Sequence, residues 1–308
     1  MSADRLARAS SIGPVTPLTQ QSNPAAAMKV LGATLRKLRL DRKMGLKNAA
    51  GHIRASMSKI SRLERGESPP RPRDVFDLLD LYGMHDEGFR AEIDAMLTRA
   101  LEPSWWNRYS DVTPGWLTRL ISLEDSAIEI HTYEVHVVPG LLQVPDYIRA
   151  LVHTALPRAE EEEVARRIEL RRQRQALLED ERHPDLTALL DEGVLHRPVG
   201  GPAVMAAQMR HLLEESSRDR INIRVVRFDK SASITPPSPM TYLKFAPGGP
   251  TEMIYLEQVN SALYLNKRVD IDAYREVLLG LWHVAETRAS SRGMLREAER
   301  RFTAAANA

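Results

Sequence analysis

The stretch that decides the fold of the N-terminal region is Ala49-Ala-Gly-His-Ile-Arg-Ala-Ser-Met-Ser-Lys-Ile-Ser-Arg-Leu-Glu-Arg-Gly66. Its larger apolar side chains are spaced as on the inner faces of two short helices. These inward residues are Ala50, Ile53, Ile60 and Leu63. The helical pattern breaks at residues 54–56. Ser56 predicts the start of the second helix because its hydroxyl can accept backbone N–H groups there, and Gly66 predicts its end.

The second of these helices, about residues 56–65, has an outer face of small, polar or cationic side chains. The outward residues are Ser56, Met57, Ser58, Ser61, Arg62 and Arg65. Such a surface suits the major groove of DNA, where base edges present hydrogen-bond donors and acceptors. Arg62 and Arg65 are the best candidates for guanine, whose O6 and N7 accept a forked pair of hydrogen bonds. Lys59 is expected to reach either a base or the backbone.

This spacing resembles the helix-turn-helix of the phage-repressor-like (Xre) family. The matching positions are Ala50, Ile60, Leu63 and the tail Lys59–Gly66. Two residues depart from the family pattern. Arg54 stands where the turn usually has Gly, at a cost of about 1 kcal/mol in the left-handed region. Gly45 stands where a capping Ser or Thr is usual, so the preceding helix is expected to start weakly.

Positive charge is concentrated around this motif. Residues 28–75 contain 13 Lys and Arg against four Asp and Glu, whereas the whole chain has a net charge of only +2. This imbalance suggests that the N-terminal region meets phosphate, although a solvated basic face is the plainer alternative. The candidates for phosphate contacts are Arg36, Arg39, Arg42, Lys43 and, at the start of the second helix, Lys47.

The sequence predicts a multi-domain chain. Residues 27–102 are expected to form an all-α domain of five helices, the last two at about 73–82 and 86–101. Residues 1–26 have too few large apolar side chains to fold and are expected to be a disordered tail. An arm that touches the DNA minor groove through Arg5 and Arg8 is the alternative.

Residues 103–308 are expected to form an α+β domain with a mixed or mainly antiparallel sheet. The predicted strands are 127–135, 186–190, 221–226, 240–245, 253–256 and 262–265. The predicted helices are 116–124, 158–180, 202–215, 271–288 and 290–302. Residues 229–239 are expected to be a loop and 247–250 a hairpin connection. Trp105 and Trp106 open this domain either as an interface anchor or as part of its core.

A second resemblance begins after the first predicted helix of this domain. The order is Leu123-Glu124, an aromatic strand, Val138-Pro-Gly-Leu-Leu-Gln143, and then Tyr147-x-Arg-Ala150. It is similar to an uncharacterised C-terminal domain (DUF5753-like) of actinomycete Xre regulators. That resemblance implies a small partner protein encoded by a neighbouring gene. The candidate ligand or partner site is Tyr133, Gln143, Tyr147 and Arg149, and the alternative is a buried turn that only fixes the domain.

The predicted helix at 158–180 contains four Glu at its start and a cluster of Arg from Arg166 to Arg174. The cluster either binds an anion or forms a solvated helix with ion pairs between successive turns. Elsewhere we found no convincing catalytic motif. His131 and His136 would face opposite sides of one strand, which argues against a metal site. Glu129 and Glu134 are an acid–base pair only in principle.

The chain has no cysteine, no apolar run of membrane-spanning length and no signal-peptide pattern. We therefore expect a cytoplasmic, nucleoid-associated protein that is not an enzyme and needs no cofactor or metal. The expected function is sequence-specific regulation of transcription by a homodimer on double-stranded DNA. The second domain would mediate dimerisation or sense a partner or ligand. The alternatives are a C-terminal small-molecule receptor or enzyme coupled to the DNA-binding module and, more weakly, a membrane-surface protein.

Overall fold

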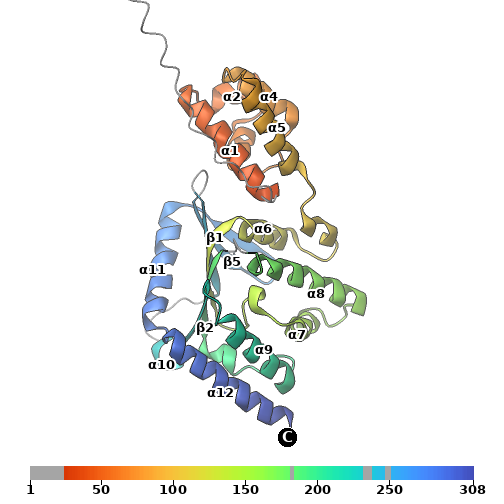
Figure 1. Ribbon diagram of the computed structural model, residues 1–308, viewed down its shortest axis with the longest axis vertical. Coiled ribbons are helices and arrows are strands. Elements are labelled where there is room, and N and C mark those ends of the chain that lie inside the picture. Colours follow the sequence, from red (N-terminus) through yellow and green to blue (C-terminus); the bar gives the residue numbers. More distant parts are fainter. Residues whose placement is uncertain (1–23, 181–183, 232–237, 247–250) are drawn as a thin grey trace, which may run out of the picture.

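The computed structural model describes residues 24–180, 184–231, 238–246 and 251–308. They form a helical N-terminal domain stacked on a larger C-terminal domain with a central sheet (Figure 1). This arrangement confirms the predicted fold class. None of the described helices is both long and apolar enough to cross a membrane.

The N-terminal domain consists of five helices around one apolar core. They are α1 (Pro24–Asp41), α2 (Leu46–His52), α3 (Met57–Glu64), α4 (Pro72–Leu81) and α5 (Glu87–Leu101). The core includes Leu31, Leu35, Ile60, Leu63, Leu78 and Ile93. α1 begins at Pro24, ahead of the expected domain boundary at residue 27. Residues 1–23 of the predicted tail lie outside the described residues.

The turn between α2 and α3 has the predicted local geometry. Arg54 has a φ of 52°, in the left-handed region. The hydroxyl of Ser56 accepts the Lys59 backbone N–H at 3.1 Å and caps α3. No side chain caps α2 at Gly45, as expected for its weak start. Gly66 follows α3 with a φ of 65° and ends it.

Helices α1 and α3 pack backbone against backbone. A Cβ atom added to Gly32 of α1 would lie 2.5 Å from the carbonyl oxygen of Leu63. A Cβ added to Gly66 would lie 2.8 Å from the Cα of Lys29. Both positions therefore require glycine, and α1 fixes the depth of α3 in the domain.

The sheet of the C-terminal domain has six strands in the order β3-β2-β1-β4-β5-β6. The strands are β1 (Ala127–Glu134), β2 (Asp185–Asp191), β3 (Ile221–Val226), β4 (Met240–Phe245), β5 (Glu252–Glu257) and β6 (Ala262–Leu265). β1, β2 and β3 are parallel, whereas β4, β5 and β6 pair antiparallel. The sheet is thus mixed, with β1 at the junction of its two halves.

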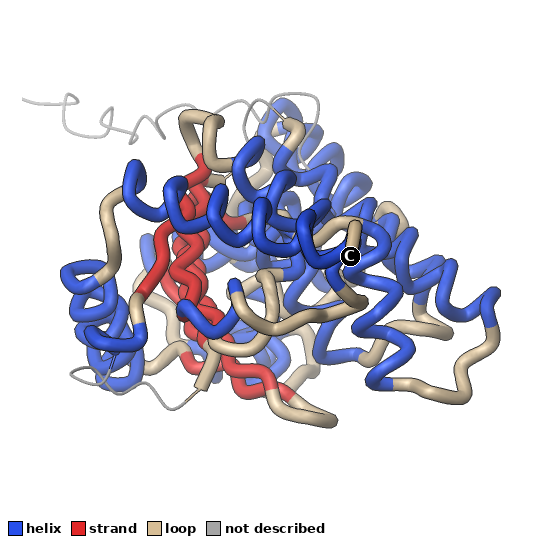
Figure 2. Tube along the Cα trace, turned by 90° about the horizontal axis from the view of Figure 1, so that it is seen from below, coloured by secondary structure: helices blue, strands red, loops and turns tan. Residues whose placement is uncertain are grey.

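Helices cover both faces of this sheet, and Figure 2 shows the strands running between them. One face carries α6 (Gly115–Glu124), α7 (Pro145–Ala155), α8 (Glu161–Gln175), α9 (Pro202–Glu215) and α12 (Arg288–Ala306). The other face carries α11 (Arg268–Val284). Each face has its own apolar core; Ile130 belongs to the first and Tyr133 to the second. From Glu129 to Glu134, even-numbered and odd-numbered residues of β1 therefore face different layers.

Several predicted boundaries were wrong. Helix α7 was not predicted, and the long helix expected at 158–180 is α8 followed by a short 3-10 turn, Ala176–Leu178. The loop expected at 229–239 begins inside a short helix, α10 (Phe228–Ser231). The remainder of that loop at 232–237 and the connection at 247–250 lie outside the described residues.

The two domains meet at the start of α1. Trp106, in the 3-10 turn Trp105–Tyr109, is buried in a cluster of the second domain, and Met28 of α1 packs against that cluster. The ammonium nitrogen of Lys29 lies 3.6 Å from the ring centroid of Phe245 in β4. Trp106 is thus a core residue of the second domain, and its cluster also receives a side chain from the N-terminal domain.

We expect Gly32→Ala to destabilise the N-terminal domain by about 1–3 kcal/mol, because the new methyl group meets backbone atoms of α3. Hydrogen exchange of the α3 amides would measure this loss for the N-terminal domain by itself. Gly51→Ala is the matched control, since a Cβ there meets no described atom within 4 Å. That change should stabilise by about 0.4–1 kcal/mol. Equal protection of α3 in both variants would contradict the close α1–α3 contact.

Candidate nucleic-acid interface

The outer face of α3 is the candidate interface. Met57 is 55% exposed, and Ser58 and Arg62 are also exposed. Ser58, Ser61, Arg62 and Arg65 share one face because they are three, four and seven residues apart. Arg62 has no hydrogen-bond or ion-pair partner in the described part of the chain, so its guanidinium is available for a ligand.

Arg65 is held in place by its neighbours. It follows α3 as its C-cap residue, and it donates hydrogen bonds to the hydroxyl of Ser61 and, at 2.7 Å, to the carboxylate of Glu67. A base contact by Arg65 would therefore require it to leave Glu67. Arg62 has no such competition and becomes the stronger candidate of the two.

Ser56 and Lys59 stabilise α3 itself. Ser56 caps the helix, and the ammonium group of Lys59 forms an ion pair with Asp74 in the first turn of α4. This pair ties the start of α3 to α4. The predicted DNA-facing set thus divides into residues that position the helix and residues that its exposed face offers to a ligand.

Arg39 is not a phosphate contact, and its prediction was wrong. Its side chain is 8% exposed and forms a forked ion pair with Glu64, at 2.6 and 2.8 Å. It also donates to the carbonyl oxygen of Met44 at 2.7 Å. Glu64 lies on the inner face of α3, 25 residues away in the sequence, so helical periodicity alone could not identify this partner.

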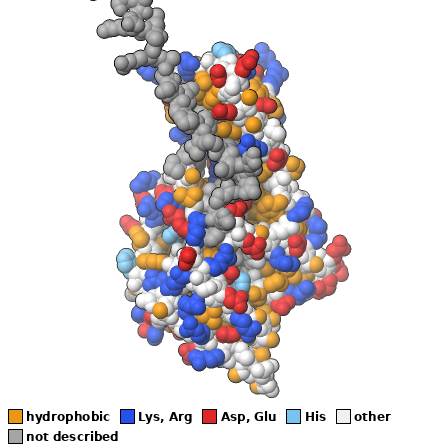
Figure 3. Space-filling view, in the orientation of Figure 1, with side chains coloured by type: hydrophobic (Ala, Val, Ile, Leu, Met, Phe, Trp, Pro, Cys, Tyr) orange, Lys and Arg blue, Asp and Glu red, His pale blue; other side chains and the backbone are white. Residues whose placement is uncertain are grey.

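The other predicted phosphate contacts are exposed. They are Arg36, Arg42, Lys43 and Lys47. Arg54, in the turn before α3, is a further exposed cation whose sequence context marks it only as a turn residue. Figure 3 shows Lys and Arg along both edges of the N-terminal domain, whereas Asp and Glu gather at the outer end of α8.

The four residues proposed as a ligand or partner site in the second domain do not converge. Tyr133 is buried on the α11 side, with its hydroxyl 3.4 Å from Asp191. Tyr147 is buried on the opposite side, where its hydroxyl accepts the N–H of Val138 at 3.1 Å. Arg149 lies at the surface and pairs with Glu161 at 2.8 Å, so the predicted grouping was wrong.

Gln143 is the member of this group that lines a cavity. Its amide nitrogen donates to the carbonyl oxygen of Val138 at 2.7 Å, which supports the view that the turn fixes the domain. The cavity, about 480 Å³, lies between α6, α8 and the sheet at β1, β4 and β5. Its charged lining residues are Glu124, Glu134, Arg171, Arg174 and Glu257.

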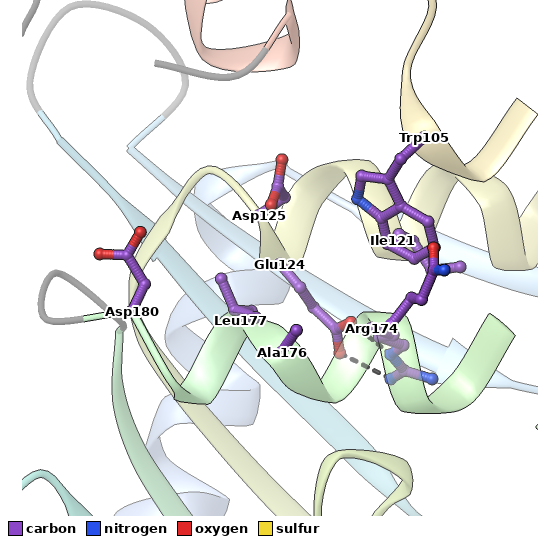
Figure 4. A pocket seen from close by; sticks show the side chains of 9 residues that line it. Trp105, Ile121, Glu124, Asp125, Arg174, Ala176, Leu177 and Asp180 are labelled. Atoms are coloured by element: carbon purple, nitrogen blue, oxygen red, sulfur yellow. Dashed lines mark hydrogen bonds and ion pairs between the residues drawn. The ribbon is translucent and has the colours of Figure 1, made fainter. Parts of the chain in front are cut away.

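Two of these charges neutralise each other. Arg174 forms a forked ion pair with Glu124, at 2.6 and 2.7 Å (Figure 4). The pair also lines a second cavity of about 340 Å³, together with Trp105 and Asp125. Burial, reinforced by the neighbouring Glu124, raises the pKa of Asp125 to about 6. The Glu124–Arg174 pair therefore forms part of the wall of both cavities.

Among the described carboxylates that line this cavity, Glu134 has the pKa most altered by its surroundings. Burial, and then repulsion from Glu257, raise its pKa to about 8 despite the opposing charge of Arg174. Glu134 accordingly holds its proton at neutral pH and can donate a hydrogen bond. Glu129 faces the other side of the sheet and pairs with Lys244 at 2.5 Å, so the two carboxylates do not form a catalytic pair.

Comparison with known families now assigns both domains. A helix-turn-helix domain model matches residues 30–92. A second model, described as a domain of unknown function (DUF5753), matches residues 117–297, more than half of the chain. The chain belongs to the DUF5753 family. No curated protein and no solved structure gives a significant match. The described residues of this DUF5753 protein contain no group of three or more His, Asp or Glu suited to a metal ion.

For this DUF5753 protein we expect Arg39→Met to destabilise the N-terminal domain by about 3–5 kcal/mol, because it leaves Glu64 buried without a counter-charge. Adding Glu64→Leu should restore most of that loss. Arg36→Met, an exposed position on the same helix, is the control. Thermal unfolding followed by circular dichroism would measure all three. A stable Arg39→Met variant with weaker, less salt-dependent DNA binding would restore the phosphate assignment.

The protonation of Glu134 predicts a pH dependence of stability. Between its ordinary pKa of 4.5 and the folded value of about 8, the folded protein binds the extra proton, so the stability from this group falls as pH rises. Glu134→Gln removes that effect. Its melting temperature relative to wild type should increase from pH 5 to pH 8, whereas Glu160→Gln, at an exposed residue, should show no trend. A constant difference would contradict the proton assignment.

Proposed function

We propose that this DUF5753 protein is a sequence-specific regulator of transcription that reads DNA with the outer face of α3. The helix-turn-helix match supports DNA binding, and the unpartnered Arg62 is the observation that carries the proposal further. A free guanidinium beside small side chains can approach base edges closely. Arginine matches the O6 and N7 acceptors of guanine with two hydrogen bonds.

The remaining contacts divide by chemistry. Met57, Ser58 and Ser61 would tune base choice. The exposed cations Arg36, Arg42, Lys43 and Lys47 are proposed to contact phosphates, which adds affinity and salt dependence without sequence choice.

We propose further that the protein acts as a homodimer and that it does not catalyse a reaction. A single α3 reads only a few base pairs, and two copies related by a two-fold axis would read half-sites about 34–36 Å apart. In this proposal the C-terminal domain pairs the subunits. It also receives the regulatory signal, from a ligand or from the small partner protein that the family resemblance implies.

Contacts at the start of α1 support a regulatory role for the second domain. Lys29 touches Phe245 of the sheet on one side and the backbone at Gly66, just after α3, on the other. Met28 packs against the cluster around Trp106. A shift of the second domain against α1 would therefore reach the end of the recognition helix directly.

Arg62→Ala should weaken binding to the selected site by about 1–3 kcal/mol and relax the preference at one base position. Arg36→Ala should instead weaken binding to all sequences and reduce the salt slope by about 1. Selection from random duplexes, followed by titration at several salt concentrations, measures both effects. Arg268→Ala, at an exposed residue of the C-terminal domain, is the control.

Two outcomes would contradict this assignment. Selection that yields no shared motif would reduce the basic domain to nonspecific phosphate binding. A monomer on the selected site, as measured by sedimentation, would refute the dimer while leaving base reading by α3 intact.

A further inference from the structure

The cavity beside β1 contains polar groups that the fold does not use. Its apolar wall comes from α6, α7 and the turn after β1. The wall residues include Trp116, Leu117, Leu120, Val137, Leu141 and Leu151. Glu134 and Arg171 enter from β1 and α8. A volume of about 480 Å³ lies within the range of small-molecule sites, about 300–1,000 Å³.

Arg171 differs from the other Arg residues of its cluster. Arg166, Arg167, Arg172 and Arg174 each have a carboxylate partner, Asp111, Glu163, Glu169 and Glu124 respectively. Arg171 has neither an ion-pair nor a hydrogen-bond partner among the described residues. Burial, together with repulsion from Arg174 and Arg167, lowers the pKa of Arg171 to about 10 against the opposing charge of Glu257. The guanidinium is therefore still charged at neutral pH, with its donors unused.

The amide oxygen of Gln143 and the carboxyl group of Glu134 are similarly unused. Gln143 is 5% exposed and lines the cavity, yet its amide oxygen has no hydrogen-bond partner. The carboxyl group of Glu134 makes no hydrogen bond to any described residue. A buried polar group without a partner costs free energy, and the amide oxygen of Gln143 is such a group. Glu134 and Arg171 are half-buried residues that line the same cavity, where a ligand could pair with them.

We propose that this cavity binds a small organic molecule with an apolar body, one acidic group and a nearby amino or hydroxyl group. The acidic group, a carboxylate or a phosphate, would accept the forked donors of Arg171. The amino or hydroxyl group would bond to Gln143 and Glu134, and the apolar body would lie against α6. This ligand class deepens the proposed regulatory role of the C-terminal domain and rests on that role for its biological meaning.

A series of neighbouring charges leads from the cavity to α1 of the N-terminal domain. A ligand on Arg171 lies one helical turn from Arg174, whose partner Glu124 precedes Asp125 in the wall of the second cavity. The charges of Asp125 and Lys29 interact, and Lys29 belongs to α1. A change in the Glu124–Arg174 pair would therefore alter the electrostatic interaction between Asp125 and Lys29 at the junction between the domains.

Ligand-observed NMR on the full chain, without DNA, tests the site with four probes. They are 3-phenylpropionate, phenethyl phosphate, L-phenylalanine and phenethylamine. The two simple acids should bind and phenethylamine should not, and their relative affinities distinguish a carboxylate from a phosphate ligand. L-phenylalanine should bind more tightly than 3-phenylpropionate, because its ammonium group meets Gln143 and Glu134.

Arg171→Met should weaken the acidic probes by about tenfold or more, as expected for loss of a charged hydrogen bond. It should leave the melting temperature of the free protein unchanged or higher, because no fold contact is lost and a desolvated charge is removed. Arg172→Met, at the exposed neighbouring residue, is the matched control and should bind the probes like wild type.

Several results would overturn the ligand site. They are no binding by any acidic probe, equal binding by phenethylamine, or unchanged affinity in Arg171→Met. A lower melting temperature of Arg171→Met with intact probe binding would instead assign Arg171 to the fold. Because the measurement contains no DNA, its failure leaves the DNA-binding proposal standing, and failure of DNA binding leaves the ligand site standing.

Discussion

The buried ion pair between Arg39 and Glu64 is the constraint on which the DNA-binding domain depends. Two charges removed from water are expensive unless each meets its partner in good geometry, and this pair meets in a forked arrangement. Gly32 and Gly66 bring the α1 backbone against the end of α3 next to the same pair. Because α3 is fixed from its inner side by α1, its outer face is left free for small polar side chains and for Arg62.

Helix α1 therefore contacts both the recognition helix and the second domain. Its middle and end hold α3 through Gly32 and Arg39, and its start meets the second domain through Met28 and Lys29. Burial lowers the pKa of Lys29 to about 8 against the opposing effect of Asp125. Because burial lowers this pKa toward neutral pH, the charge of Lys29 depends on how closely the second domain covers it. The regulatory proposal needs such a responsive junction, and no separate linker has to carry the signal.

The sequence predicted structure best where interactions between residues close in sequence determine it. The turn at Arg54, the cap at Ser56 and the stop at Gly66 depend on residues within one or two helical turns. The antiparallel pairing of β4 and β5 followed from two short apolar runs with a turn between them. Helix α7 was missed, although Pro145 at its first turn and the spacing of Tyr147 and Leu151 are local signals that were available.

The remaining errors concern contacts between residues distant in sequence. Helical periodicity placed Arg39 outside because it could not reveal Glu64 on another helix. Tyr133 and Tyr147 are close in sequence but lie on opposite faces of the sheet. The anion-binding alternative for the Arg cluster of α8 could be narrowed to Arg171 only after the structure assigned carboxylates to its neighbours.

Four arginines show how a charge that stabilises the fold differs from one that is available to a ligand. Arg39 and Arg174 have little exposure and each forms an ion pair with a carboxylate, so both side chains stabilise the fold. Arg62 at the surface and Arg171 in the cavity have equivalent chemistry and no partner among the described residues. A free arginine in water costs little, whereas one in a cavity costs stability that selection would remove unless another benefit offset it. The stronger inference of a missing ligand therefore attaches to Arg171. For Arg62 the helix-turn-helix match supports DNA binding by its domain, and a base contact by Arg62 itself is our proposal.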